Sequence, residues 1–158
     1  MGALLVGIGD MKVGRAGDVI TTLGLGSCVG VVLYDKSAKI GGMAHIMLPS
    51  SKGFDASNRA KFADLAIIDL VNLMGRAGAR RGALTAKIAG GAHMFSGKAD
   101  NVLMVGDRNV AACKEILRLL NIPVTAMDVG GTFGRTIELH TDTGGLNIRT
   151  VGAGQKMI

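Results

Sequence analysis

A cysteine and a histidine on two neighbouring apolar segments are the residues of this chain best suited to chemistry. Cys28 follows a glycine-rich stretch and opens the apolar segment 28–34, and His45 lies within the apolar segment 40–48. A cysteine thiolate attacks a carbonyl carbon, and a nearby histidine can lower the pKa of the thiol by forming an ion pair with it. The two residue types therefore predict nucleophilic catalysis of acyl transfer.

Whether the two side chains meet depends on the turn between the two segments. Apolar segments joined by four polar or small residues are typical of a β-hairpin. If Asp35 pairs with Ile40, then position 28 lies opposite Met47. His45 then projects from the same face as Cys28, on a diagonal where backbone atoms are about 7–8 Å apart. A turn with an odd number of residues would shift the register by one and separate the two side chains.

The stretch before the cysteine could hold the oxygen of a substrate. Gly24 and Gly26 leave the backbone uncovered. Main-chain N–H groups near Ser27 and Cys28 can therefore point at a carbonyl oxygen as it becomes an oxyanion. Thr22, on the preceding strand, is available to orient the histidine. The alternative is that the cysteine and the histidine are ordinary core residues of an apolar hairpin, with the glycines serving only turns.

The rest of the chain supplies the elements that would position these residues. Apolar, β-branched stretches predict strands at residues 3–8, 19–23, 28–34, 40–48, 84–89, 124–128, 136–140 and 146–150. Helical periodicity predicts helices over 57–77 and 107–120, with Asp107 as the cap of the second. Runs of strands with inserted helices indicate an α/β fold of the α+β kind. We expect one layered domain over residues 1–158, with mostly antiparallel β-sheets flanked by two main helices.

Composition and charge exclude several classes of protein. Of the 158 residues, 48% are hydrophobic and 19% are charged, which predicts a folded globule rather than a disordered chain. The net charge of +6 is scattered along the chain, and aromatic residues make up only 3%. Neither a clustered basic motif nor a stacking surface for nucleic acid is present, so we expect no nucleic-acid partner.

The distribution of cysteines and apolar runs predicts a cytoplasmic protein. Cys28 and Cys113 are far apart, and their spacings to the histidines are not those of metal-ligand pairs, so no metal is expected. Cys113 falls within the second predicted helix, where a buried thiol is the simplest interpretation. No run approaches the roughly 18 apolar residues of a membrane span. The first residues lack the basic leader of a signal peptide, so a reducing compartment is expected.

Five segments of the chain together resemble the signature of one protein family. They occur in the family's order, span nearly the whole chain and cover residues 23–28, 41–49, 87–95, 105–110 and 128–135. These segments resemble the CheD family, the chemoreceptor glutamine deamidases. The resemblance implies a layered α/β fold. It also implies hydrolysis of specific glutamines in the methylation helices of chemoreceptors to glutamate, with release of ammonia.

The resemblance assigns roles to individual residues. It implies that Cys28 is the nucleophile that carries a thioester, that His45 is the base and that Thr22 orients the histidine. The reaction needs no metal and no organic cofactor. Gly26 and Ser27 are expected to support the oxyanion.

The loop at 90–93 has two interpretations. Gly90, Gly91 and His93 could line the substrate cleft. The two glycines could equally serve only to let the backbone turn beside the site, with His93 at a loop position that has no chemical role.

Two other functions remain open at this point. The same site could hydrolyse receptor methyl esters, because a thioester intermediate serves both leaving groups. The chain could instead be a non-catalytic module that binds and regulates a CheC-type phosphatase, a partner that the resemblance also implies. In each case the partners are proteins, and no direct membrane insertion is expected.

Overall fold

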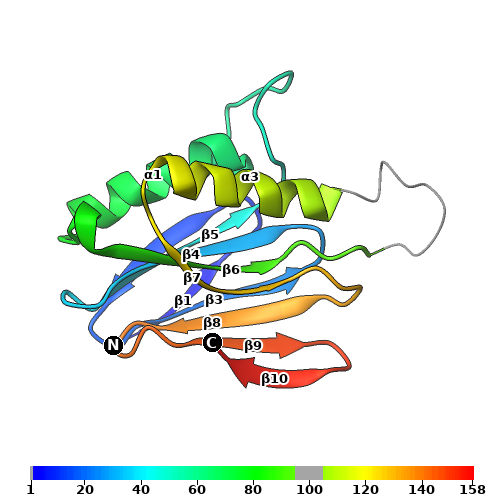
Figure 1. Ribbon diagram of the computed structural model, residues 1–158. Coiled ribbons are helices and arrows are strands. Elements are labelled where there is room, and N and C mark those ends of the chain that lie inside the picture. The colour runs from blue at the N-terminus through cyan, green and yellow to red at the C-terminus, as the bar shows by residue number, and fades with distance from the viewer. Residues whose placement is uncertain (1, 95–104) are drawn as a thin grey trace.

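The computed structural model describes residues 2–94 and 105–158, which form three layers (Figure 1). Two α-helices lie over one five-stranded sheet, and a second five-stranded sheet lies against the other face of the first. The strands are β1 Ala3–Val6, β2 Met11–Arg15, β3 Val19–Leu25, β4 Val29–Asp35, β5 Ile40–Ile46, β6 Leu84–Gly90, β7 Val124–Val129, β8 Arg135–His140, β9 Leu146–Thr150 and β10 Gly154–Met157. The helices are α1 Ala63–Arg76 and α3 Val105–Leu119, with short 3-10 turns at Arg59–Lys61 and Arg81–Ala83.

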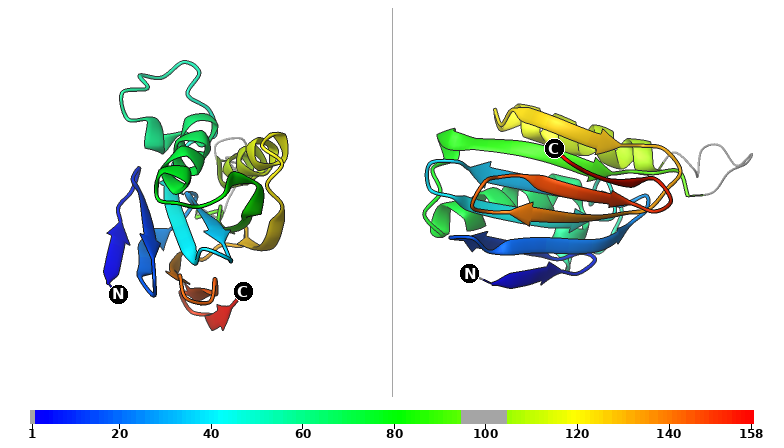
Figure 2. Two further views of the ribbon diagram at one scale, coloured as in Figure 1. Left: turned by 90° about the vertical axis from the view of Figure 1, so that its left-hand side faces the viewer. Right: turned by 90° about the horizontal axis from the view of Figure 1, so that it is seen from below.

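Each sheet is mixed, with a single parallel pair. The outer sheet has the strand order β1-β3-β8-β9-β10, and the helix-covered sheet has the order β2-β5-β4-β6-β7. The pairs β1–β3 and β6–β7 are parallel, and the other pairs are antiparallel. The predicted α+β class with mostly antiparallel sheets is therefore confirmed, and both helices cover the same sheet face (Figure 2). No helix in the described ranges is long and apolar enough to cross a bilayer.

The helix-covered sheet is buried on both faces at its centre. Every residue of β4 and β5 is buried, and successive side chains point to opposite faces. Val31 and Leu33 pack with Leu70 under the helices. Val32 and Met43 pack into the second apolar layer, between the two sheets. Because both faces of these strands are buried, their sequences are continuous apolar runs rather than an alternation of apolar and polar residues.

The register of the β4–β5 hairpin is the one that an even-length turn predicts. Asp35 pairs with Ile40 and Val29 pairs with Ile46. The buried Asp35 carboxylate holds the turn by accepting hydrogen bonds from the N–H groups of Ser37 (3.0 Å), Ala38 (3.1 Å) and Arg80 (2.8 Å). These bonds, led by the one from Arg80, hold the pKa of Asp35 below its usual value. The predicted relation between positions 28 and 45 therefore holds at the level of the backbone.

Two strands and one helix start differ from the prediction. β2 and β10, each at the edge of its sheet, were not predicted. All four residues of β10 are exposed, so it carries no apolar signal. The helix predicted from residue 57 begins at Ala63, because Asn58 caps a separate 3-10 turn and accepts a hydrogen bond from the N–H of Ala60 at 3.2 Å. Phe62 is then extended and pairs with Leu48.

Smaller corrections concern the ends of elements near the candidate site. The predicted strand 28–34 is shifted by one residue, because β4 runs from Val29 to Asp35, and the predicted strand 40–48 is two residues too long, because β5 ends at Ile46. Beyond that point the N–H of Met47 donates to the Lys61 carbonyl at 2.8 Å, which draws the chain away from β4. α3 begins at Val105, so Asp107 lies within its first turn and is not its cap. Phe95, the last residue of one signature segment, lies outside the described residues.

Two glycine-to-alanine substitutions test the tightness of the layer between the sheets. A Cβ at Gly41 would lie 2.7 Å from Leu139 Cδ2 and 3.2 Å from Thr141 Cγ2, so Gly41→Ala should lower the free energy of unfolding by about 1–3 kcal/mol. Gly75, on α1, has open space around it. Gly75→Ala should therefore raise stability by up to about 1 kcal/mol through helix propensity. Urea unfolding of both variants measures this, and equal effects would contradict the packing argument.

Candidate active site

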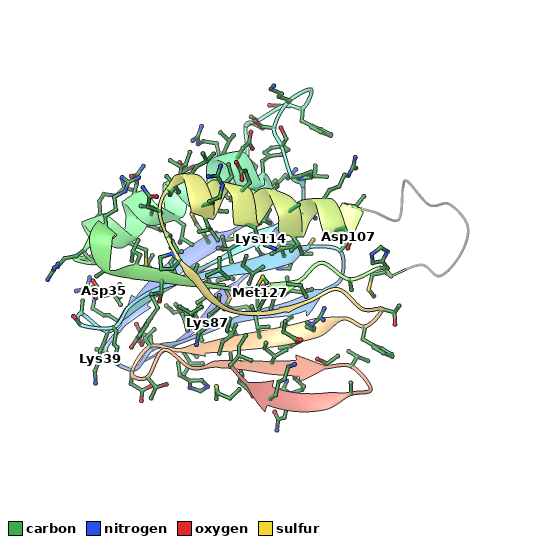
Figure 3. All side chains as sticks on the ribbon, viewed as in Figure 1. Asp35, Lys39, Lys87, Asp107, Lys114 and Met127 are labelled. Atoms are coloured by element: carbon green, nitrogen blue, oxygen red, sulfur yellow. The ribbon has the colours of Figure 1, made fainter. Side chains whose placement is uncertain are left out.

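The three residues singled out for chemistry come from three different strands or their ends. Thr22 lies on β3 in the outer sheet, His45 lies on β5, and Cys28 immediately precedes β4. Figure 3 shows Asp35 at one end of the molecule and Asp107, at the start of α3, toward the other end. Because Asp35 ends β4 and Cys28 precedes it, the cysteine lies at the end of the sheets away from the hairpin turn.

Thr22 determines which nitrogen of His45 carries the proton. Both residues are fully buried. The Thr22 hydroxyl donates to the Val6 carbonyl at 2.7 Å, and its oxygen lies 2.7 Å from His45 Nδ1. A carbonyl can only accept, so the single hydroxyl hydrogen is used there and Nδ1–H must donate to Thr22 Oγ1. His45 Nε2 is then an unprotonated acceptor, and among the described residues it has no hydrogen-bond partner.

The surroundings of both groups favour neutral forms. Burial lowers the pKa of His45 from its usual value of 6.5. Burial also raises the pKa of the Cys28 thiol from its usual value of 9.0. The expectation that His45 lowers the thiol pKa is therefore wrong for the free protein, because loss of hydration disfavours both charged forms. The arrangement suits a neutral imidazole that takes the thiol proton as a substrate is attacked.

Cys28 lies on the same face of the helix-covered sheet as His45. His45 is paired with Gly30, two residues after Cys28, and its side chain reaches across to Thr22 in the outer sheet. Cys28 is partly buried and packs against the apolar layer between the sheets. Within the described residues the thiol makes no hydrogen bond to the imidazole. The structure thus brings Thr22 and His45 into contact and places the cysteine on their side of the sheet.

The backbone around the cysteine is held by three donors from elsewhere in the chain. In the Cys28 loop (residues 26–28), the Gly26 carbonyl accepts from the N–H of Ala92 at 2.8 Å. The Cys28 carbonyl accepts from the N–H of Gly91 at 2.9 Å. The third donor is a side chain on α3, which binds the Ser27 carbonyl at 2.9 Å. Among the described residues, the main-chain hydrogen bonds of the loops include none donated by the N–H of Ser27 or Cys28.

The third donor is Asn109, which lies in the second predicted helix and is not among the residues that the sequence singled out for the site. It is fully buried, and its Nδ2 also donates to the Met47 carbonyl at 3.0 Å. The available signal was a polar residue on the buried face of an otherwise amphipathic helix.

The loop after β6 supports the cysteine through its backbone. Gly90 has a φ of +109°, and a Cβ there would overlap the Cys28 carbonyl oxygen, so no other residue fits without moving the Cys28 loop. His93 lies apart from this contact, and its Nε2 is 3.0 Å from the Asp107 carboxylate. The observed role of Gly90 and Gly91 is therefore structural. That these two glycines and His93 line a substrate cleft stays a prediction.

The described residues contain no group of three or more histidine, cysteine, aspartate or glutamate side chains placed to hold a metal ion. Cys113, on α3, is fully buried, as predicted, and burial raises its pKa to about 12. The described part of the site can therefore offer a thiol, an imidazole base and main-chain donors.

Comparison with known proteins identifies relatives along nearly the whole chain. Residues 47–150 match the family model described as CheD chemotactic sensory transduction. A Caldanaerobacter subterraneus protein named "Probable chemoreceptor glutamine deamidase CheD" is 50% identical over 157 residues, covering 98% of this chain and 97% of its own. The Bacillus subtilis "Chemoreceptor glutamine deamidase CheD" is 50% identical over 156 residues, covering 97% and 94%. A solved Neisseria meningitidis protein superposes with a TM-score of 0.49 at 11% identity, covering 83% and 63%.

The two cysteines should differ sharply in reactivity. Only the thiolate form of a cysteine reacts with iodoacetamide. Cys113 is fully buried and its pKa is raised to about 12, so it should not react in the folded protein. The native protein should therefore take up a single label, at the partly buried Cys28. The labelling rate should rise with pH into the range above 9.0, because burial raises the pKa of Cys28. Peptide mass mapping locates the label. Labelling of Cys113 in the folded protein would contradict the assigned environments, and labelling in urea shows that both thiols are intact.

Proposed function

The chain belongs to the CheD family, and we propose that it is a chemoreceptor glutamine deamidase: an amidohydrolase that converts glutamine side chains of chemoreceptors to glutamate and releases ammonia. The observation that carries the proposal is the hydrogen bond between Thr22 and His45, which leaves a bare, buried imidazole nitrogen on the side of the sheet where Cys28 lies. The printed names of the Caldanaerobacter and Bacillus relatives support the substrate class.

The first half of the proposed reaction transfers the acyl group to the protein. Substrate binding brings the glutamine carboxamide to Cys28, and His45 Nε2 accepts the thiol proton as the sulfur attacks the carbonyl carbon. The N–H groups of Ser27 and Cys28 stabilise the oxyanion. Nε2–H then protonates the nitrogen of the collapsing intermediate, the carbon–nitrogen bond breaks, and ammonia leaves a thioester on Cys28.

The second half regenerates the thiol. His45 Nε2 takes a proton from a water molecule as its oxygen attacks the thioester carbonyl. The carbon–sulfur bond breaks, the sulfur recovers the proton, and the product is a glutamate side chain. In both halves Thr22 accepts from Nδ1–H, so it keeps the ring oriented and stabilises the imidazolium.

Partners and location form part of the same proposal. We place the enzyme in the cytoplasm, where its thiol stays reduced and receptor helices are accessible. The family resemblance supports a second partner, a CheC-type phosphatase. Hydrolysis of receptor methyl esters is distinguished from deamidation by mass spectrometry of a receptor fragment, because deamidation raises the mass of a modified residue and demethylation lowers it.

Removal of the nucleophile tests the chemistry. Cys28→Ala should lower ammonia release from a purified chemoreceptor cytoplasmic fragment by at least about 10⁴-fold, the scale of loss when a nucleophile is deleted. Cys113→Ala is the matched control and should retain activity, because that thiol is buried on α3. Thermal unfolding of both variants establishes that they are folded. Ammonia release by Cys28→Ala at a rate near that of the wild type would contradict the proposed mechanism.

The pH dependence of kcat/KM should report His45. The reaction needs neutral Nε2 as base, and burial lowers the pKa of His45, so the acid limb should have its midpoint below 6.5. The same shift makes the unfolded chain bind a proton more readily than the folded one. The contribution of His45 to the free energy of unfolding is therefore fully present above pH 6.5. It declines as the pH falls from 6.5 through the lower pKa of His45 in the folded protein. An acid limb centred above 6.5 would contradict the assignment.

A further inference from the structure

Asn109 occupies an unusual place for a polar side chain. It lies in the first half of α3, on the buried face that also carries Cys113 and Leu117. Its Nδ2 donates two hydrogen bonds, to the Ser27 carbonyl at 2.9 Å and to the Met47 carbonyl at 3.0 Å. One nitrogen thus connects the Cys28 loop to the chain just after His45.

These two carbonyls lie where the hairpin ladder ends. The last pair of β4 and β5 is Val29 with Ile46, and Met47 is drawn away toward Lys61. Asn109 bridges this opening, so it holds the two sides of the hairpin together next to the cysteine. A primary amide is suited to this because a single nitrogen supplies two donors on a short side chain, whereas a carboxylate supplies none.

The bond to Ser27 also orients the N–H of Cys28. The Ser27 carbonyl and the Cys28 N–H belong to one planar, trans peptide unit, in which the two groups point in opposite directions. Holding the oxygen at 2.9 Å therefore fixes the direction of the N–H. In the described loops this N–H donates no main-chain hydrogen bond, so its direction is set by the carbonyl on the other side of the same unit.

The approach of α3 depends on a glycine. A Cβ at Gly106 would lie 2.6 Å from the Gly91 oxygen and 2.7 Å from the Ala92 oxygen, closer than such atoms approach. Only glycine lets this turn of the helix, near Asp107 in Figure 3, come close enough for Asn109 to reach the two carbonyls. Asn109 Oδ1 is buried without a partner among the described residues, which costs folding free energy. The side chain is therefore not the most stabilising choice for this position.

We infer that Asn109 is a positioning residue of the deamidation reaction, which aims the Cys28 N–H at the oxyanion and holds the Cys28 loop against the strand of His45. The inference rests on the proposed function. It extends the site from the thiol, the imidazole and the hydroxyl to a fourth side chain that touches no substrate and acts through the backbone.

Two isosteric substitutions test it. Asn109→Asp keeps the shape and removes both donors, and Asn109→Leu removes them without adding a charge. Each should lower kcat for ammonia release from a chemoreceptor fragment by about 100-fold, with KM within about twofold of the wild type, because the lost interaction operates in the transition state. Asn72→Asp, on the exposed side of α1, is the matched control and should have wild-type kcat.

Alkylation separates orientation of the N–H from general damage to the site. In alkylation the Cys28 sulfur attacks the saturated carbon of iodoacetamide, and no oxyanion forms. The rate of Cys28 alkylation in Asn109→Leu should therefore stay within about twofold of the wild-type rate. Unchanged kcat in both Asn109 variants would overturn the inference. Parallel loss of alkylation, deamidation and thermal stability would also overturn it, because Asn109 would then be a purely structural residue. Failure of the wild-type protein itself to release ammonia would instead reject the proposed function, and the inference with it.

Discussion

The hydrogen-bonded chain from the Val6 carbonyl through the Thr22 hydroxyl to the His45 ring is the constraint on which the rest of the site depends. Val6 and Thr22 face each other in the parallel β1–β3 pair, and His45 comes from the other sheet. Because the carbonyl takes the only hydroxyl hydrogen, the histidine must present its unprotonated nitrogen away from Thr22. The tautomer of the proposed base is thus a property of how two sheets pack.

The same packing determines the charge of the resting site. Complete burial of His45 and partial burial of Cys28 favour a neutral pair over a thiolate and an imidazolium. In such surroundings a fixed donor interacts more strongly with a developing oxyanion than it would in water. The proposed enzyme therefore separates charge only when a substrate is bound, and its acid limb reports the histidine.

The Cys28 loop owes its conformation to three donors from two other parts of the chain. The loop after β6 contributes two N–H groups, and α3 contributes the amide of Asn109. Gly90 and Gly106 permit these close approaches, since a Cβ at either position would meet backbone oxygen atoms. The backbone that carries the cysteine is therefore hydrogen-bonded through its carbonyl groups, and in the proposed mechanism the N–H groups of Ser27 and Cys28 stabilise the oxyanion. α3 therefore covers the sheet and also donates a hydrogen bond to the Cys28 loop.

The sequence by itself determined the hairpin, because two apolar segments joined by a short polar turn are a local feature. It made the shared side of Cys28 and His45 conditional on an even-length turn, and the observed pairing of Asp35 with Ile40 met that condition. It also determined the α+β class and, through its signature segments, the family. The edge strands β2 and β10 lacked a pattern because neither is buried on a full face. Only the tertiary structure decided the histidine tautomer, the raised thiol pKa and the two hydrogen bonds of Asn109. Each depends on contacts between residues distant in the chain, and on burial that no local pattern encodes.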